Sequence, residues 1–377
     1  MRVYADHGAT TPVDPRVVAA MVPYFSEEFG NAGSLHAWGQ TAREAVDVAR
    51  EQVARALGCA PAEVVFTSGA TEADNVAVGG ATLANEDRGR HVVVSAVEHH
   101  AVLEPCRFLE SRGLEVTYVP VDRTGRVDPD DVRRALRDDT ILVSVMHANN
   151  ELGTIQPIAE IGRLVRERGI LMHSDAAQTV GILPVDVDAL SVDLLSVSAH
   201  KRYGPKGVGA LYVRHRARLQ RVQHGGAQER NRRAGTENVP GIVGFGEALR
   251  LALGLMTDEA ARLRALRDRF RAALAAIPGA QLNGDPVDGL PGTVSISFEG
   301  TDSESLLMAL DFRGIAASSG SACTSGSLEP SHVLRAIGLP PTLARGTVRF
   351  SFGRATTAAD VDYLAAVVPE VIAALRR

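Results

Sequence analysis

Two lysines stand out in a chain whose other basic residues are all arginines. Of the 40 Lys and Arg residues among 377, only Lys201 and Lys206 are lysines. An amine can lose its proton and attack a carbonyl to form a Schiff base, whereas a guanidinium stays protonated. Lys201 follows the apolar run Leu194–Ser198, in a position typical of a strand that ends in a loop. Lys201 is therefore the candidate for amine chemistry. A solvated surface lysine is the alternative, and it is stronger for Lys206.

A turn rich in small residues, Thr67–Glu72, follows one predicted strand and opens a helix. Backbone N–H groups at a helix N-terminus, with hydroxyl side chains beside them, suit a phosphate. The turn has neither the P-loop pattern nor a dinucleotide-binding fingerprint. Taken alone, a plain helix capped by Ser or Thr is the simpler interpretation.

A carboxylate, Asp175, ends another predicted strand, and Lys201 follows 26 residues later at the end of the next apolar run. Open α/β sheets bind ligands at the carboxyl ends of their strands. Alone, Asp175 could equally cap a helix. Together, the carboxylate, the amine and the phosphate turn match pyridoxal phosphate (PLP), which needs partners for its pyridine nitrogen, its aldehyde and its phosphate.

Of the three cysteines, Cys323 is the candidate for chemistry. It lies in the Ser/Gly-rich stretch Ser318–Ser327, whose composition predicts a mobile surface loop, whereas a structural cysteine is usually packed among apolar side chains. Cys59 and Cys106 are predicted to be structural, because they fall at a helix end and on a helix among Leu and Phe. No metal site is expected, since the sequence has no HExxH pair and no Cys/His ligand set.

Short β-rich runs alternate with helical stretches, which predicts an α/β fold with a mostly parallel sheet. We place this large, PLP-binding domain at residues 12–253. The predicted strands are Val64–Phe66, His91–Val97, Val116–Val119, Ile141–Met146, Ile170–His173, Leu194–Ser198 and Ala210–Val213. The predicted helices include Leu35–Leu57, Asn75–Ala84, Leu103–Ser111 and Ile158–Arg168.

The pattern then changes and predicts a smaller α+β domain, residues 254–377 together with 1–11, which would carry the Cys323 loop. An amphipathic helix is expected over Arg262–Ala275. The further elements expected are Thr293–Phe298, Glu304–Asp311, Ile315–Ser318, Val333–Ile337, Val348–Phe352 and Ala359–Leu375.

Composition narrows the class of protein. A hydrophobic content of 45% and a charged content of 23% are those of an ordinary soluble globular protein. A net charge of -5 gives no electrostatic footprint for nucleic acid or for anionic lipid. No stretch approaches the roughly 18 apolar residues of a membrane span, and the first residues lack the apolar core of a secretory signal. Three distant cysteines argue against a disulfide framework, so we expect a cytoplasmic protein.

With these motifs in place, the chain resembles the NifS/IscS-like cysteine desulfurases nearly from end to end. These enzymes belong to the class-V aminotransferases, which are PLP-dependent transferases of fold type I. His7 and Gly8 stand where the family varies, so their role stays open. The matching segments are Asp6–Pro12, Thr67–Glu72, Glu98–His99, His147–Glu151, His173–Gln178, Ser198–Lys201, Arg233–Asn238, Ser318–Cys323 and Arg349–Ser351.

The resemblance implies a role for each residue that would face the cofactor. Lys201 would form the Schiff base, and Asp175 would pair with the pyridine nitrogen. Gln178 would contact the ring hydroxyl, and His99 would stack on the ring and assist as an acid or base. The phosphate would be held by Ala70, Thr71, Ser198, His200 and, from the second chain of a homodimer, Thr236.

The resemblance also implies the reaction. Arg349 would clamp the carboxylate of L-cysteine together with Asn150, and Asn31 would line the substrate side. After Lys201 removes the α-proton, Cys323 would attack the substrate sulfur, keep it as a persulfide and release L-alanine. The persulfide would supply sulfur for Fe–S clusters, tRNA thiolation or other acceptors, through an acceptor protein such as an Fe–S scaffold or a thiolation enzyme.

Two alternatives stay open at this point. A selenocysteine lyase or an aminotransferase of the same fold would use the same cofactor residues, but Cys323 favours the desulfurase. A sulfur-carrier or scaffold subunit without catalysis would not need Lys201, Asp175 and His99.

Overall fold

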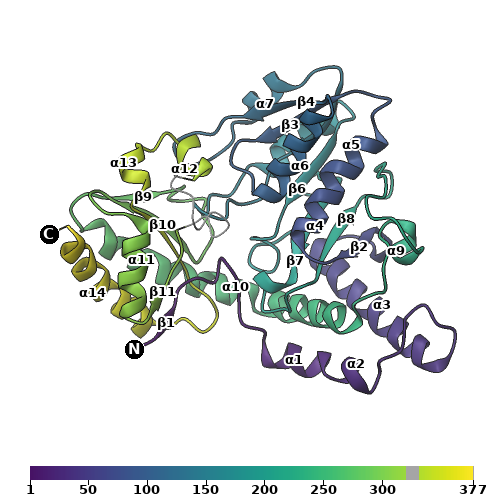
Figure 1. Ribbon diagram of the computed structural model, residues 1–377, viewed down its shortest axis with the longest axis horizontal. Helices are drawn as coiled ribbons and strands as arrows, with labels where there is room; N and C mark the ends of the chain where they lie inside the picture. The colour runs from purple at the N-terminus through teal and green to yellow at the C-terminus, as the bar shows by residue number, and fades with distance from the viewer. Residues whose placement is uncertain (320–330, 377) are drawn as a thin grey trace.

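A computed structural model describes residues 1–319 and 331–376, which form one large sheet, two small sheets and the helices that cover them (Figure 1). The large sheet, with α1 to α9 around it, lies on the right of the view, and the small sheets lie on the left near both chain termini. Cys323 and most of the Ser318–Ser327 stretch lie outside the described residues.

The large sheet has the strand order β2-β8-β7-β6-β5-β3-β4. The neighbours from β4 to β7 pair in parallel, and β8 runs antiparallel between β7 and β2. All seven predicted strands occur, and the α/β class is confirmed. The bounds are β2 Val64–Thr67, β3 His91–Ser95, β4 Glu115–Val119, β5 Thr140–Ser144, β6 Leu171–Asp175, β7 Leu194–Ser198 and β8 Gly209–Val213.

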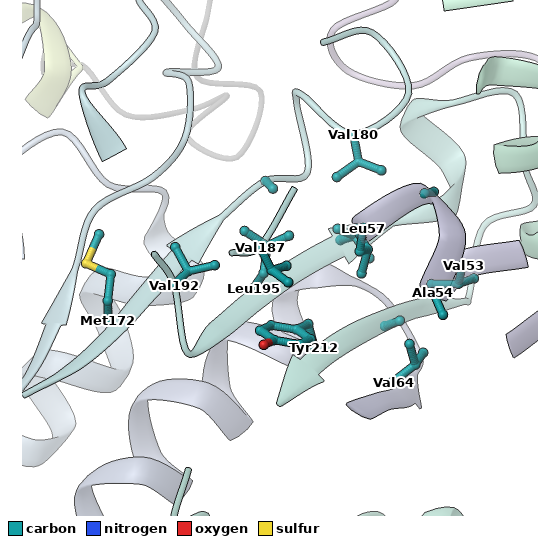
Figure 2. Close-up of a cluster of buried hydrophobic side chains, with 14 of the residues drawn as sticks. Val53, Ala54, Leu57, Val64, Met172, Val180, Val187, Val192, Leu195 and Tyr212 are labelled. Carbon is teal, nitrogen blue, oxygen red and sulfur yellow. The ribbon is translucent and has the colours of Figure 1, made fainter. Parts of the chain in front are cut away.

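This sheet is buried on both faces because successive side chains of a strand point to opposite sides. Val93 of β3 and Leu195 of β7 enter one core, which helices α3 and α10 also line. Their neighbours Val92 and Leu194 enter the other core, against α6 and the turn before α5. Figure 2 shows part of the first core, where side chains of α3 lie beside those of β7 and β8. The sheet is thus fixed from both sides, with its strand ends in set positions.

The helices around the large sheet connect its strands. The helix expected over 75–84 begins earlier and has three parts, α4, a π-helical turn Val76–Gly80, and α5. Short helices such as α7 and α9 were not predicted, since each spans two turns or fewer. The bounds are α1 Pro15–Met21, α2 Pro23–Ser26, α3 Ala37–Leu57, α4 Ala70–Asn75, α5 Ala81–Ala84, α6 His100–Ser111, α7 Pro129–Ala135, α8 Ile158–Arg166, α9 Gln228–Asn231 and α10 Val239–Ala275, with short 3-10 turns at Pro61–Glu63 and Ala199–Lys201.

The smaller sheets build a separate core. β9, β10 and β12 form an antiparallel sheet in the order β12-β10-β9, and β1 pairs in parallel with β11. Phe270 of α10 packs here with Phe298, Phe350 and the N-terminal residues Val3 and Ala5. The bounds are β1 Val3–Tyr4, β9 Ala280–Asn283, β10 Thr293–Phe298, β11 Ile315–Ala316, β12 Thr347–Ser351, α11 Ser303–Phe312, α12 His332–Ala336, α13 Pro341–Ala344 and α14 Ala358–Leu375.

Helix α10 joins the two cores and corrects one expectation, the start of the long helix. It begins at Val239 rather than at residue 262, and it runs unbroken through the predicted boundary at 253/254. The sequence hides its first half because Gly241, Gly244 and Gly246 lower helix propensity there. Gly246 has a packing reason, since a Cβ at this position would lie 2.7 Å from the Cα of Ala49 in α3. The division into domains at 11/12 and 253/254 stays a prediction.

The same helix comes nearer to a membrane span than the sequence analysis expected. Within the described part of the chain, α10 alone is long and apolar enough to cross a bilayer by length and composition. However, 56% of its most apolar window is buried in the fold, where it packs on α3 and on the large sheet. Its apolar character is accounted for by this core.

We predict that Leu57→Ala, in the core drawn in Figure 2, lowers the free energy of unfolding by about 3 kcal/mol. Leu57 is fully buried at the end of α3, so its loss leaves a cavity beside β7 and β8. Denaturant unfolding would measure the change. Glu51→Ala on the exposed side of the same helix should shift the value by less than about 0.5 kcal/mol. Equal effects of the two changes would contradict this account of the core.

Candidate active site

A pocket of about 540 Å³ opens where the carboxyl ends of the parallel strands meet the small sheet. Asp175 at the end of β6 and Ser198 at the end of β7 line it, with Lys201 just beyond. Arg349 reaches the same pocket from β12 of the small sheet. Lys206, which is exposed, lines it too. Ten of the predicted site residues line this pocket, namely Ala70, Thr71, His99, Asn150, Asp175, Gln178, Ser198, His200, Lys201 and Arg349.

The amine of Lys201 is held by the backbone of the N-terminal segment. Its Nζ donates to the carbonyl of Gly8 at 2.6 Å and to that of Ala9 at 2.9 Å. Burial, and then the nearby charge of Arg349, lowers the pKa of Lys201 to about 8. An amine with this pKa is partly neutral near pH 7, as both attack on an aldehyde and removal of a proton require.

The carboxylate of Asp175 lies on the buried floor of the pocket. One oxygen accepts from the N–H of Ala177 at 2.8 Å. Burial, reinforced by the neighbouring Asp74, raises the pKa of Asp175 to about 7. Asp74 of α4 is itself fully buried, and burial raises its pKa to about 7 as well. A buried acid of this kind gains a favourable partner when a protonated ring nitrogen is placed against it.

The turn Thr67–Glu72, predicted to bind phosphate, packs closely against β8. Gly209 has no side chain at this contact, and a Cβ there would lie 2.8 Å from the Cα of Gly69. Glu72 ties the turn together by accepting from the N–H of Ser68 at 2.6 Å and by an ion pair with Arg233 at 2.7 Å. The turn therefore presents its small residues to the pocket in a fixed arrangement.

One buried hydroxyl in the pocket is left unsatisfied. The Oγ of Ser198 has no hydrogen-bond partner among residues 1–319 and 331–376, although it is shielded from water. A buried hydroxyl without a partner is costly, so it points to a ligand oxygen that completes it. With the amine of Lys201 and the acid of Asp175, this hydroxyl makes the pocket fit PLP.

His99 directly precedes α6 and caps that helix. Its Nδ1 accepts from the N–H of Ala101 at 3.1 Å, which leaves the ring proton on Nε2 in the neutral form. Burial, and then the charge of Lys201, lowers the pKa of His99 to about 4. The ring is therefore neutral at physiological pH, able to lie against an aromatic ring and to donate from Nε2.

Arg349 and Gln178 both line the pocket, and both contact the N-terminal segment. Arg349 is buried, donates from Nη1 to the carbonyl of Asn150 at 2.7 Å and pairs through Nη2 with Asp6 at 2.9 Å. The Nε2 of Gln178 donates to the carbonyl of Gly8 at 3.1 Å. The segment Asp6–Ala9 thus contacts the amine, the guanidinium and the amide at once.

Three predicted site residues are not brought into this pocket by the described chain. Thr236 is exposed and lines a separate, smaller pocket with Ser68 and Gly207. Asn31 lies exposed in the loop before α3, where its Oδ1 accepts from the N–H of Gly33 at 2.8 Å. Cys323 lies outside the described residues.

Several residues at the pocket were given no role from the sequence. Gly8 and Ala9 line the pocket and Asp6 pairs with Arg349, because the N-terminal segment crosses the site. The segment matches the family, but no local motif signals these contacts. Asp74 and Glu151 also face it, and burial raises the pKa of Glu151 to about 7. Their only sequence signal is an acid inside an otherwise apolar or small-residue motif.

The other two cysteines lie in environments that do not activate a thiol. Burial raises the pKa of Cys59 to about 12 and that of Cys106 to about 12, so both stay as thiols. No three His, Cys, Asp or Glu side chains in the described part of the chain gather as a metal ion would require.

Known proteins resemble this chain over nearly all of its length. Residues 3–364 match the family described as Aminotransferase class-V. A protein of Methanosarcina thermophila named Cysteine desulfurase IscS is 52% identical over 99% of this chain and 93% of its own, and one of the same name from Dictyoglomus turgidum is 52% identical over 99% and 95%.

Solved structures also resemble this chain over nearly all of its length. One titled as a NifS-like protein is 39% identical, has a TM-score of 0.93, and covers 99% of this chain and 100% of its own. Another, titled SspA in complex with cysteine, is 38% identical with a TM-score of 0.83, over 93% and 98% of the two chains.

We predict that PLP capture by the cofactor-free protein rises with pH, reaches half its maximum near pH 8 and levels off about one pH unit higher. Only the neutral amine attacks the aldehyde, and burial brings the pKa of Lys201 from 10.5 to about 8, so the neutral form is reached at lower pH. Stopped-flow absorbance between pH 6 and pH 10 would follow the capture. Lys206→Arg should leave the profile unchanged, whereas a rate that keeps climbing to pH 10 would contradict the assignment.

Proposed function

Since the chain belongs to the class-V aminotransferase family and is a PLP-dependent cysteine desulfurase, we propose that Lys201, Asp175 and Arg349 divide its chemistry among them. Lys201 holds the cofactor and then acts on the α-proton of L-cysteine, Asp175 pairs with the ring nitrogen, and Arg349 binds the substrate carboxylate. The observation that supports this most is the convergence of a low-pKa amine, a buried acid and an unsatisfied hydroxyl in one pocket.

Bound PLP supplies an aldehyde for the amine of the substrate and an electron-withdrawing ring that stabilises negative charge at the α-carbon. Lys201 is suited to move the α-proton because its buried amine is neutral above about pH 8. Asp175, which is buried, would keep the ring nitrogen protonated through a charge-assisted hydrogen bond. His99, neutral and with its proton on Nε2, would lie against the ring face and can donate from Nε2.

Different residues of the pocket would hold the phosphate and the substrate. Ala70, Thr71, Ser198 and His200 would hold the phosphate, and Gln178 would contact the ring hydroxyl. At the substrate end, Arg349 keeps donors available after its bonds to Asp6 and Asn150, because a guanidinium has five N–H groups. Asn150 supports the clamp through its carbonyl, and its side chain reaches the substrate.

Cys323 takes the sulfur in this proposal. Its thiolate forms an S–S bond with the substrate sulfur while the Cβ–S bond breaks, and the electron pair stays on the carbon part. Protonation of that carbon and return of the α-proton by Lys201 give L-alanine, and a persulfide is left on Cys323. Fe–S clusters, tRNA thiolation or other acceptors would receive the sulfur through an acceptor protein. The high pKa of the Cys59 and Cys106 thiols leaves them unsuited to this step.

We also propose that two chains form a homodimer in which each pocket is completed by the partner. Thr236 is exposed beside the phosphate turn and is free to reach a second chain. An apolar surface around the loop before α3 supports the dimer, since Phe25, Phe29 and Leu35 are 65%, 68% and 91% exposed. Asn31 lies within this surface and would meet the substrate side of the partner pocket.

We predict that Cys323→Ser binds PLP and responds to L-cysteine but releases neither sulfide nor L-alanine. The hydroxyl that replaces the thiol cannot accept a sulfur atom. Cys59→Ser and Cys106→Ser should stay active and lose only stability, because both side chains are packed. Mass spectrometry after L-cysteine is added to the native protein should find the extra sulfur on Cys323. Finding it on Cys59 or Cys106 would overturn this role.

We predict that Phe29→Arg with Leu35→Arg converts the dimer to monomers and weakens PLP retention. The two arginines place charge in the apolar surface, and separation removes Thr236 from the partner pocket. Sedimentation velocity and the absorbance of bound cofactor would measure both effects. Phe312→Arg is a matched control, since that side chain is 85% exposed on α11 of the small sheet. A monomeric protein with full activity would rule out the shared site.

A further inference from the structure

The N-terminal segment crosses the substrate end of the pocket, and its role was left open by the sequence. Asp6 forms a bridge with Ser351 of the small sheet, whereas Thr11 bonds to the carbonyl of His200 at 2.8 Å beside the large sheet. Between these anchors, the carbonyl of Gly8 accepts from Lys201 and Gln178. The segment is therefore a fixed wall of the pocket, and its side chains have set positions relative to substrate.

Asp6 is the ionic partner of the proposed carboxylate clamp. Its Oδ1 lies 2.9 Å from Nη2 of Arg349, and the two side chains are 19% and 3% exposed. Gly8 allows this contact, because a Cβ at Gly8 would lie 3.2 Å from the central carbon of the guanidinium. The N–H of Gly8 donates to Ser351 Oγ at 2.7 Å, which holds the turn in place. The negative charge of Asp6 is thus built into the site rather than placed there by a mobile side chain.

Asp6 interacts with two cations of the pocket, Arg349 and the partly protonated Lys201. Arg202 and Asp175 also act on Lys201, and the exposed Lys206 lines the pocket as well. Burial raises the pKa of Glu151 to about 7, so that acid carries only part of a charge. Burial lowers the pKa of the three neighbouring histidines, which stay neutral: His99, His200 and His332. The negative charge of Asp6, next to Arg349, therefore contributes to the electrostatic potential around a substrate side chain.

We propose that Asp6 is a specificity-determining residue that makes the site reject amino acids with an anionic side chain. The inference rests on the proposed function, in which Arg349 binds the α-carboxylate. L-Cysteine brings that one carboxylate and a neutral thiol, so Arg349 can balance its charge. A side-chain carboxylate or sulfinate would bring a second negative charge into a poorly hydrated site that already holds Asp6, and like charges repel strongly there.

The test compares L-aspartate with L-asparagine, which have nearly the same shape and differ in side-chain charge. Dissociation constants are measured on the PLP-loaded protein from the change in the visible absorbance of the cofactor. The native protein should bind L-asparagine more tightly than L-aspartate. In Asp6→Asn the ratio of the L-aspartate constant to the L-asparagine constant should fall about tenfold. A merely structural role of Asp6 would weaken both ligands alike and leave the ratio unchanged, which would overturn the proposal.

Matched variants complete the design. Asp6→Glu keeps the charge and should keep the discrimination, which guards against misfolding of the asparagine variant. Asp87→Asn removes the same charge from a surface pair with Arg218 and should leave the ratio as in the native protein. Loss of the discrimination in Asp6→Glu, or a changed ratio in Asp87→Asn, would count against Asp6 as the source of selectivity.

A further variant separates this inference from the proposed function. Arg349→Gln should weaken L-alanine at least tenfold, because the product carries the same α-carboxylate. If it does so while Asp6→Asn leaves the ratio unchanged, only the selectivity proposal fails. If Arg349→Gln binds L-alanine normally, the clamp is misassigned and both proposals fall.

Discussion

The chemistry depends on a primary amine that is removed from water and still hydrogen-bonded. Lys201 is buried enough for its pKa to fall to about 8, yet its Nζ keeps two backbone carbonyls as partners. An ammonium buried without such partners would destabilise the fold, and a fully solvated amine would stay protonated at neutral pH. The amine of Lys201 is neither unpartnered nor fully solvated. The N-terminal segment that supplies its two carbonyl partners is therefore part of the proposed catalytic site.

The hydrophobic cores of the large and small sheets hold the pocket residues in position. The parallel strands β6 and β7 bring Asp175 and Ser198 to one edge of a sheet that is buried on both faces, so their positions are fixed. The small sheet contributes Arg349 from β12, and the chain links the cores through residues 5–11 and through α10. Because residues 8–10 line the pocket themselves, a change in packing of the N-terminal link would alter the distance between the amine and Arg349, the proposed carboxylate clamp.

A site residue can be predicted from the sequence when a local pattern, such as the end of a strand, marks its position. Lys201 and Asp175 could be found because each ends a β-rich run, and strand ends of a parallel sheet meet at one edge. Asp6 and the carbonyl of Gly8 could not, since their partners lie about 190 to 340 positions away and a backbone acceptor has no sequence signal. The first half of α10 was missed because its glycines lower helix propensity while allowing close approach to α3.

Residues whose proposed roles involve a second chain limit the prediction of the site in a different way. Thr236 and Asn31 are exposed in the described chain, and their proposed roles require a second copy whose surface complements the apolar residues around Phe29. Family resemblance predicted these roles where the pattern of the residues did not. The same is true of Cys323, whose role as sulfur acceptor rests on the resemblance and on the unsuitable thiols of the other two cysteines.

The central claim is that one lysine of two carries the cofactor, and it can be tested directly. Borohydride reduction of the PLP-loaded protein fixes the cofactor to the amine that holds it, and proteolysis with mass spectrometry then locates the label. The account predicts a single labelled peptide that contains Lys201 as the modified residue. A label on Lys206, or one shared between the two lysines, would contradict it.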